Sequence, residues 1–224
     1  MRFYILPFVA AAWATVVLRG GSAVADDLKF EIGVPSGYSA GDIEWSGFED
    51  FDDDQVFTGT IEVLHKPFLS FDDYSNSNIQ SVISQMRQIK GAHYTPSFVS
   101  KAENQALAAN HDDHVSTFLV ECGGPDANPR RIAQGIDYLN HLPDSARCSN
   151  KALHCGRISC SWNSAIWLCN ERSDPGTDHQ CNMFGGYANS ILKYCTINDK
   201  NPRVSGKNDD NELMVSVVVK WDDC

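Results

Sequence analysis

Eight cysteines constrain this chain more than any other feature, because all of them lie in its second half. The first is Cys122 and the last is the final residue of the 224-residue sequence. In an exported protein, an even number of cysteines predicts a set of disulfide bonds. We therefore expect four disulfides among Cys122, Cys148, Cys155, Cys160, Cys169, Cys181, Cys195 and Cys224.

The first 25 residues predict that the chain is exported. Arg2 is followed by an almost wholly apolar run over residues 3–18, and small residues at Ala23 and Ala25 suit signal peptidase. We expect cleavage between Ala25 and Asp26. A membrane anchor is disfavoured, because about 16 apolar residues are short for a hydrocarbon core of ~30 Å. No later segment is apolar enough to span a membrane, so the prediction is a secreted, extracellular protein that is not an integral membrane protein.

Two other uses of the cysteines are less consistent with their spacing. A structural zinc site normally shows close pairs of cysteine or histidine ligands, and this sequence contains no Cys-x-x-Cys pair. A free catalytic thiol is the second alternative, and it too is disfavoured in an exported chain with an even cysteine count. Eight cysteines allow 105 pairings, and the spacing does not choose among them.

Charge divides the chain in a similar place. Residues 26–121 carry 17 acidic and 5 basic side chains, whereas residues 122–224 carry 12 and 11. We therefore predict a signal peptide at 1–25, an acidic cysteine-free segment or prosegment at 26–113, and a cysteine-rich α/β domain at 114–224. The acidic balance disfavours nucleic acid and anionic lipid as partners, because both require a basic surface.

The acidic segment shows a few local patterns. Residues 49–55 form an acidic cluster, which we interpret as a solvated loop; a calcium loop would need a turn glycine and a bidentate glutamate that are missing. Residues 56–64 have the composition of a strand. Residues 77–90 predict an amphipathic helix with Ile79, Val82, Ile83, Met86 and Ile89 on one face. A second, polar helix is expected to end near Asn110.

The cysteine-rich part has an ordered series of patterns. Alternating or helical apolar spacing predicts a strand at 114–122, a helix at 130–142, a β-hairpin at 157–169, a helix at 183–195 and a strand at 212–221, with turns at 123–129 and 206–211. The order is βαββαβ. We therefore predict an α+β protein: a disulfide-stapled two-layer sandwich of the ferredoxin-like kind, with the acidic α/β segment in front of it.

Candidate functional residues are few. Trp162 and Trp167 in the hairpin are expected to belong to the core or a half-exposed sheet, with a partner-binding patch as the alternative. Arg130-Arg131 is a dibasic pair that a secretory-pathway protease could cut, although we favour its placement in the first turn of a helix. The sequence contains no HExxH or glycine-rich phosphate motif, and we name no catalytic residue, metal ligand or cofactor.

The stretch CGRISCSWNSAIWLCN, preceded by RRIAQGIDYLNHL and followed by GGYANSILKYC and a last strand closing on Cys224, resembles small secreted cysteine-rich fungal effector-like proteins. It is also distantly similar to fungal killer toxins and necrosis-inducing effectors, and this similarity implies a killer-toxin-like form of the same disulfide-stapled sandwich. The resemblance covers about Cys122 to Cys224, and the acidic leader departs from it.

The resemblance implies a non-catalytic toxin-like or virulence protein that binds a host or competitor protein or a cell-surface component. Two alternatives stay open: a secreted hydrolase or hydrolase inhibitor, and a structural surface protein of the fungus itself.

Overall fold

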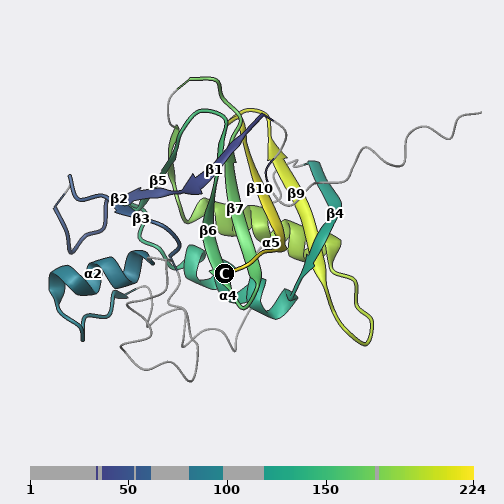
Figure 1. Ribbon diagram of the computed structural model, residues 1–224, viewed down its shortest axis with the longest axis horizontal. Coiled ribbons are helices and arrows are strands. Elements are labelled where there is room, and N and C mark those ends of the chain that lie inside the picture. The colour runs from purple at the N-terminus through teal and green to yellow at the C-terminus, as the bar shows by residue number, and fades with distance from the viewer. Residues whose placement is uncertain (1–33, 35–36, 53, 62–80, 98–118, 175–176) are drawn as a thin grey trace, which may run out of the picture.

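The computed structural model describes residues 34, 37–52, 54–61, 81–97, 119–174 and 177–224. Over these residues the protein is an α+β fold with three helices, two sheets and four disulfides (Figure 1). The predicted signal peptide and its cleavage site at Ala25 and Asp26 lie outside the described residues. So do the polar helix near Asn110 and parts of three predicted elements, at 62–64, 77–80 and 114–118.

The larger sheet has six strands in the order β1-β6-β7-β10-β9-β4. β1 runs parallel to β6, and every other neighbouring pair is antiparallel. The strands are β1 (Ser39–Asp42), β6 (His154–Ser161), β7 (Ser164–Asn170), β10 (Val215–Trp221), β9 (Val204–Asp210) and β4 (Leu119–Ala127).

The smaller sheet has four short antiparallel strands in the order β3-β2-β5-β8. They are β3 (Phe57–Thr58), β2 (Glu44–Ser46), β5 (Arg147–Asn150) and β8 (Thr177–Gln180). Strands from the acidic segment therefore pair with strands of the cysteine-rich part in both sheets, through β1 with β6 and through β2 with β5.

Helices α4 (Pro129–Asn140) and α5 (Met183–Cys195) lie together on one face of the six-stranded sheet, and α2 (Val82–Lys90) lies beside β3 (Figure 1). Pro129 begins α4 at a position where its missing N–H is not needed, and the Asn128 side chain accepts a hydrogen bond from the Arg130 N–H. α4 and α5 pack closely at Gly185, where an added Cβ would lie 2.0 Å from the Asn140 side chain.

The main core lies between this sheet and its two helices. Its largest fully buried side chains include Ile158, Ile166 and Leu168 from the hairpin and Phe184 from α5. A smaller apolar cluster lies on the opposite face of the sheet, which we call the outer face; its buried members are Cys155, Cys160, Ala165, Trp167, Cys169 and Val218.

All eight cysteines are paired, as expected. Cys122–Cys195 joins β4 to the end of α5, and Cys148–Cys181 joins β5 to the segment before α5. Cys155–Cys169 crosses the β6–β7 hairpin, and Cys160–Cys224 holds the last residue against β6. Each bridge can contribute ~2–4 kcal/mol by restricting the unfolded chain.

The predicted ferredoxin-like arrangement is not confirmed, because the sheet contains a strand that was expected to be a turn. Residues 206–211 contain glycine, asparagine and aspartate, which favour turns. They instead belong largely to β9, which lies between β10 and β4. The polar side chains of β9 have partners: Asn208 donates to the Tyr187 carbonyl at 3.1 Å, and Lys207 binds two carboxylates.

The predicted turn at 123–129 is also wrong over its first five residues. β4 continues to Ala127 through a wide bulge: five residue steps from Cys122 to Ala127 lie opposite two steps of β9, from Gly206 to Val204. Gly123 and Gly124 have φ values of 142° and 110°, which L side chains rarely adopt. Glycine here therefore permits a bulge and not a chain reversal.

The short strands β1, β2, β5 and β8 were not predicted, and β3 covers only Phe57–Thr58 of the strand expected at 56–64. Helix α2 and the acidic loop agree with prediction apart from one residue. Helix α2 buries Val82, Ile83 and Met86, but Ile89 is 53% exposed, because only the first turns of the helix meet the core. The described residues of the acidic cluster at 49–55 lie in a loop, as expected.

Candidate functional site

The tip of the β6–β7 hairpin carries an unusual residue. Trp162 and Asn163 alone connect Ser161 to Ser164, and their φ values are 51° and 58°. Two-residue hairpin turns with positive φ at both positions favour asparagine, aspartate and glycine, because a bulky side chain is strained there. Trp162 occupies the first position and is 46% exposed. The chain therefore presents a large aromatic side chain at a backbone position poorly suited to it.

A second tryptophan lies at the same end of the sheet. Trp221, the last residue of β10, pairs with Ser164, and the following Asp222 N–H donates to the Asn163 carbonyl at 3.4 Å. Trp221 is 45% exposed. Two half-exposed indoles therefore project from one end of the stapled hairpin.

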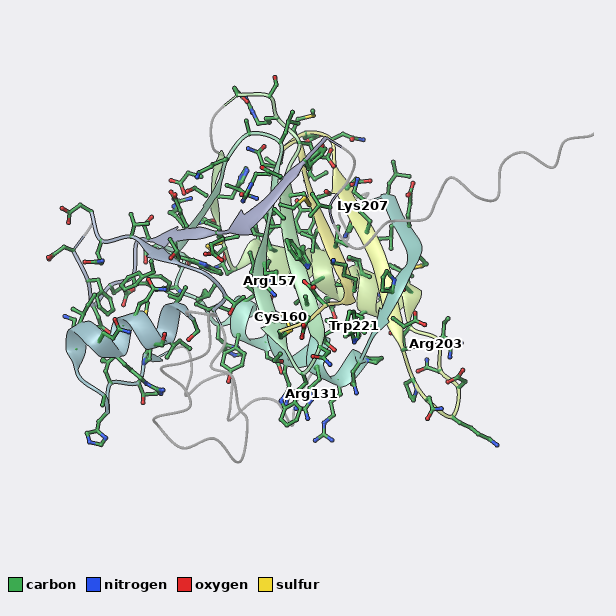
Figure 2. All side chains as sticks on the ribbon, viewed as in Figure 1. Arg131, Arg157, Cys160, Arg203, Lys207 and Trp221 are labelled. Carbon is green, nitrogen blue, oxygen red and sulfur yellow. A yellow bond between two sulfur atoms is a disulfide. The ribbon has the colours of Figure 1, made fainter. Side chains whose placement is uncertain are left out.

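Arg131 completes this end. Its guanidinium carbon lies 4.6 Å from the centroid of the Trp162 ring, a cation–π contact, and Figure 2 shows Arg131 and Trp221 at the same end of the molecule. The start of α4 fixes its position, since the Asn128 N–H donates to Ser164 Oγ at 3.1 Å. We call Arg131, Trp162 and Trp221 the end surface.

Arg130 and Arg131 both lie in the first turn of α4, where we expected them. Arg130 is exposed, whereas Arg131 is partly covered by Trp162.

Trp167 has a different environment from Trp162. It is 7% exposed in the outer-face cluster, and its ring lies between two cations: Lys220 Nζ at 4.8 Å and the Arg157 guanidinium at 5.7 Å from the centroid. Its indole nitrogen is buried and has no hydrogen-bond partner among the described residues. Of the two predicted tryptophans, only Trp162 is accessible to a partner.

A cluster of charged side chains around Lys207 lies on the outer face. Lys207 lies 3.1 Å from Glu171 and 2.6 Å from Asp209. Burial alone would lower the pKa of Lys207, but the hydrogen bonds with Asp209 and Glu171 hold that pKa above its usual value. Burial raises the pKa of Asp209, which Lys207 partly offsets. Arg157 and Lys207 lie on this same face (Figure 2).

Trp221 and Lys220 were not among the predicted site residues. The alternation of the last strand places Trp221 on the same side as Val217 and Val219, and Lys220 on the other side. In the structure Trp221 lies past the end of the core and is 45% exposed, whereas Lys220 is 2% exposed beneath its neighbours.

Within the described residues, no group of three histidine, cysteine or acidic side chains could hold a metal ion. No helix of this part of the chain is both long enough and apolar enough to cross a bilayer.

Comparisons of the chain with protein-family models, with curated proteins and with solved structures find no match. The fold and the site therefore define the class on their own: a disulfide-rich α+β protein with an aromatic end surface. Four disulfides in a domain of this size are typical of extracellular proteins.

Proposed function

We propose that this protein is a secreted, non-catalytic, effector-like or toxin-like binding protein of fungal type. Its partner would be a host or competitor protein, or another cell-surface component, recognised through the end surface. The resemblance of its cysteine-rich part to fungal effectors supports the proposal, and so does a disulfide framework typical of extracellular fluids.

One observation carries the proposal: Trp162 occupies a turn position with φ of 51° while remaining 46% exposed. Strained backbone positions cluster at functional sites, since selection for stability alone would replace them. Tryptophan and arginine are also the residues most enriched at the energetic centres of protein interfaces. Neither the turn nor the core requires an exposed tryptophan at position 162. We therefore attribute this side chain to the binding of a partner.

The test compares stability and binding in the same variant. Trp162→Asn places a residue suited to positive φ at the turn, so the thermal midpoint should stay equal or rise. Trp162→Asn with Trp221→Ala should weaken binding of the labelled protein to intact cells or cell-wall preparations at least about 30-fold, the loss expected for ~2 kcal/mol at an interface centre.

Tyr194→Ala is the matched control, because Tyr194 is an aromatic residue 61% exposed near the end of α5, outside the end surface. It should bind like the wild type. A double variant that is folded and binds with unchanged affinity would show that the end surface does not recognise the partner.

A further inference from the structure

A small hollow opens on the outer face beside the bulge of β4. Its volume is about 100 Å³, and its wall includes Glu121, Gly123, Gly124, Lys207, Val218 and Lys220. The bulge creates it, because the extra residues of β4 have no paired residues on β9 between Gly206 and Val204. At Gly123 an added Cβ would meet no atom of the described residues within 4 Å, so this part of the chain leaves that side of the hollow open.

Lys220 is the unusual member of this wall. It is 2% exposed, yet within the described part of the chain it forms no hydrogen bond or ion pair, and its one close polar contact is with the Trp167 ring. Burial lowers its pKa, Arg157 acts in the same direction, and Asp222 opposes them. Asp222 acts on Lys220 from a distance, but no carboxylate of the described residues forms an ion pair with its ammonium, and natural proteins normally pair a lysine that is so little exposed.

Lys207 lies in the same wall and, unlike Lys220, forms ion pairs. Its ammonium contacts both Glu171 and Asp209, so its charge is already balanced. The hollow therefore contains one lysine with carboxylate partners and one without.

We propose that the hollow binds a ligand through a single carboxylate group and that Lys220 supplies the counter-charge. This proposal does not depend on the end surface, which lies at the hairpin tip.

Charge and size both favour a carboxylate. One unpaired ammonium matches one negative charge, and Glu121 in the wall repels a dianion such as phosphate more strongly than a monoanion. A volume of about 100 Å³ can hold a group of a few heavy atoms, such as a carboxylate. It is too small for a whole sugar ring or for a large ligand. The rest of a ligand would therefore lie outside, over the glycines of the bulge.

The test is a titration of ¹³C-labelled protein at constant ionic strength, following the Lys220 Cε–Hε signal. Sodium acetate should cause a saturable shift, and acetamide, its uncharged analogue, should cause none. Inorganic phosphate should bind more weakly than acetate. Glucuronate and N-acetylglycine then distinguish a sugar acid from a peptide C-terminus as the natural source of the carboxylate.

Two variants make the result decisive. Lys220→Met removes the charge but keeps an apolar chain of similar length, so the fold should be retained or stabilised. The acetate affinity, read from the Val218 amide signal, should fall about tenfold or more, the loss expected for a charged hydrogen bond. Lys200→Met, at an exposed position outside the hollow, is the matched control and should keep acetate binding. Non-saturable shifts with acetate, an equal response to acetamide, tighter phosphate binding, or unchanged binding in Lys220→Met would overturn the proposal.

Discussion

At the scale of the residue, His154 shows how closely the edge of the larger sheet is fitted. It is 8% exposed at the start of β6, and its Nδ1 lies 2.7 Å from Ser39 Oγ on the neighbouring β1. An added Cβ at Gly41 would lie 2.9 Å from the His154 ring, so glycine is required opposite it. One imidazole therefore helps to hold β1, a strand from the acidic segment, against β6.

This placement predicts how stability depends on pH. Burial lowers the pKa of His154, Lys151 adds to the effect and Asp42 opposes it; burial also lowers the pKa of His179. Near pH 6.5 the unfolded chain takes up these protons more readily than the folded one, so stability is full above that pH and falls as pH drops toward the folded pKa. Urea unfolding at pH 7.5 and 5.5 should show a smaller loss of stability for His154→Gln than for wild type. Equal losses would contradict the prediction.

At the scale of the element, local sequence patterns predicted the three described helices and five of the ten described strands. The hairpin, α4, α5 and β10 were each predicted within a few residues, because a repeating apolar face marks the core directly. β9 was missed because its stability comes from partners that are distant in sequence, such as Glu171 for Lys207. The bulge of β4 was missed for a related reason, since Gly-Gly-Pro-Asp favours a turn unless a neighbouring strand continues the pairing. The cysteine count predicted four disulfides, but only the fold could determine their partners.

The two candidate sites were likewise predicted only in part from the sequence. Composition drew attention to Trp162, and local alternation placed Lys220 away from the main core. Neither signal could show that the turn at Trp162 has a positive φ, or that Lys220 lies buried beside a hollow. The first depends on the exact pairing of Ser161 with Ser164 across β6 and β7, and the second on contacts between β4, β9 and β10. Neither is specified by a local pattern.

The junction between the two sheets depends on a single buried amide. Asn150, the last residue of β5, donates from Nδ2 to the carbonyls of His154 at 2.7 Å and Leu168 at 2.9 Å. The Asn170 side chain in turn donates to the Asn150 carbonyl at 3.1 Å. These bonds connect the end of β5 with β6 and β7, which belong to the other sheet.

Asn150→Leu should therefore destabilise the protein by about 1–3 kcal/mol, because two buried carbonyl groups lose a donor. Denaturant unfolding, with the slope checked to be unchanged, would measure this loss. Asn198→Leu, at an exposed position, is the control and should change stability by less than about 0.5 kcal/mol. A loss no larger than that of the control would show that the amide does not hold the sheets together.

At the scale of the whole molecule, the boundary in composition does not coincide with a boundary in packing. The acidic segment contributes Ile43, Trp45 and Phe57 to the main core, and all three are at most 1% exposed. Trp45 donates its indole N–H to the Gly59 carbonyl at 2.7 Å, and Gly156 of β6 leaves room for Ile43, since a Cβ there would lie 2.7 Å from it. The acidic side chains of this segment that the structure describes are exposed, while these apolar residues complete the core of the cysteine-rich part.

A chain of residues 114–224 should therefore be much less stable than one of residues 26–224, even with all four disulfides formed. Removing three fully buried large side chains costs ~1.5–3 kcal/mol each in lost burial alone, against a total stability of about 5–15 kcal/mol for a typical domain. Calorimetry should show a thermal midpoint lowered by more than ~10 °C, or no cooperative transition.

Intact mass with alkylation would first confirm that neither chain has a free thiol. The double variant Ile43→Ala, Trp45→Ala in the longer chain should reproduce part of the loss, because burial and not chain length is its cause. If the shorter chain unfolds cooperatively at the midpoint of the longer one, the cysteine-rich part is an independent domain and the acidic segment only an appendage to it.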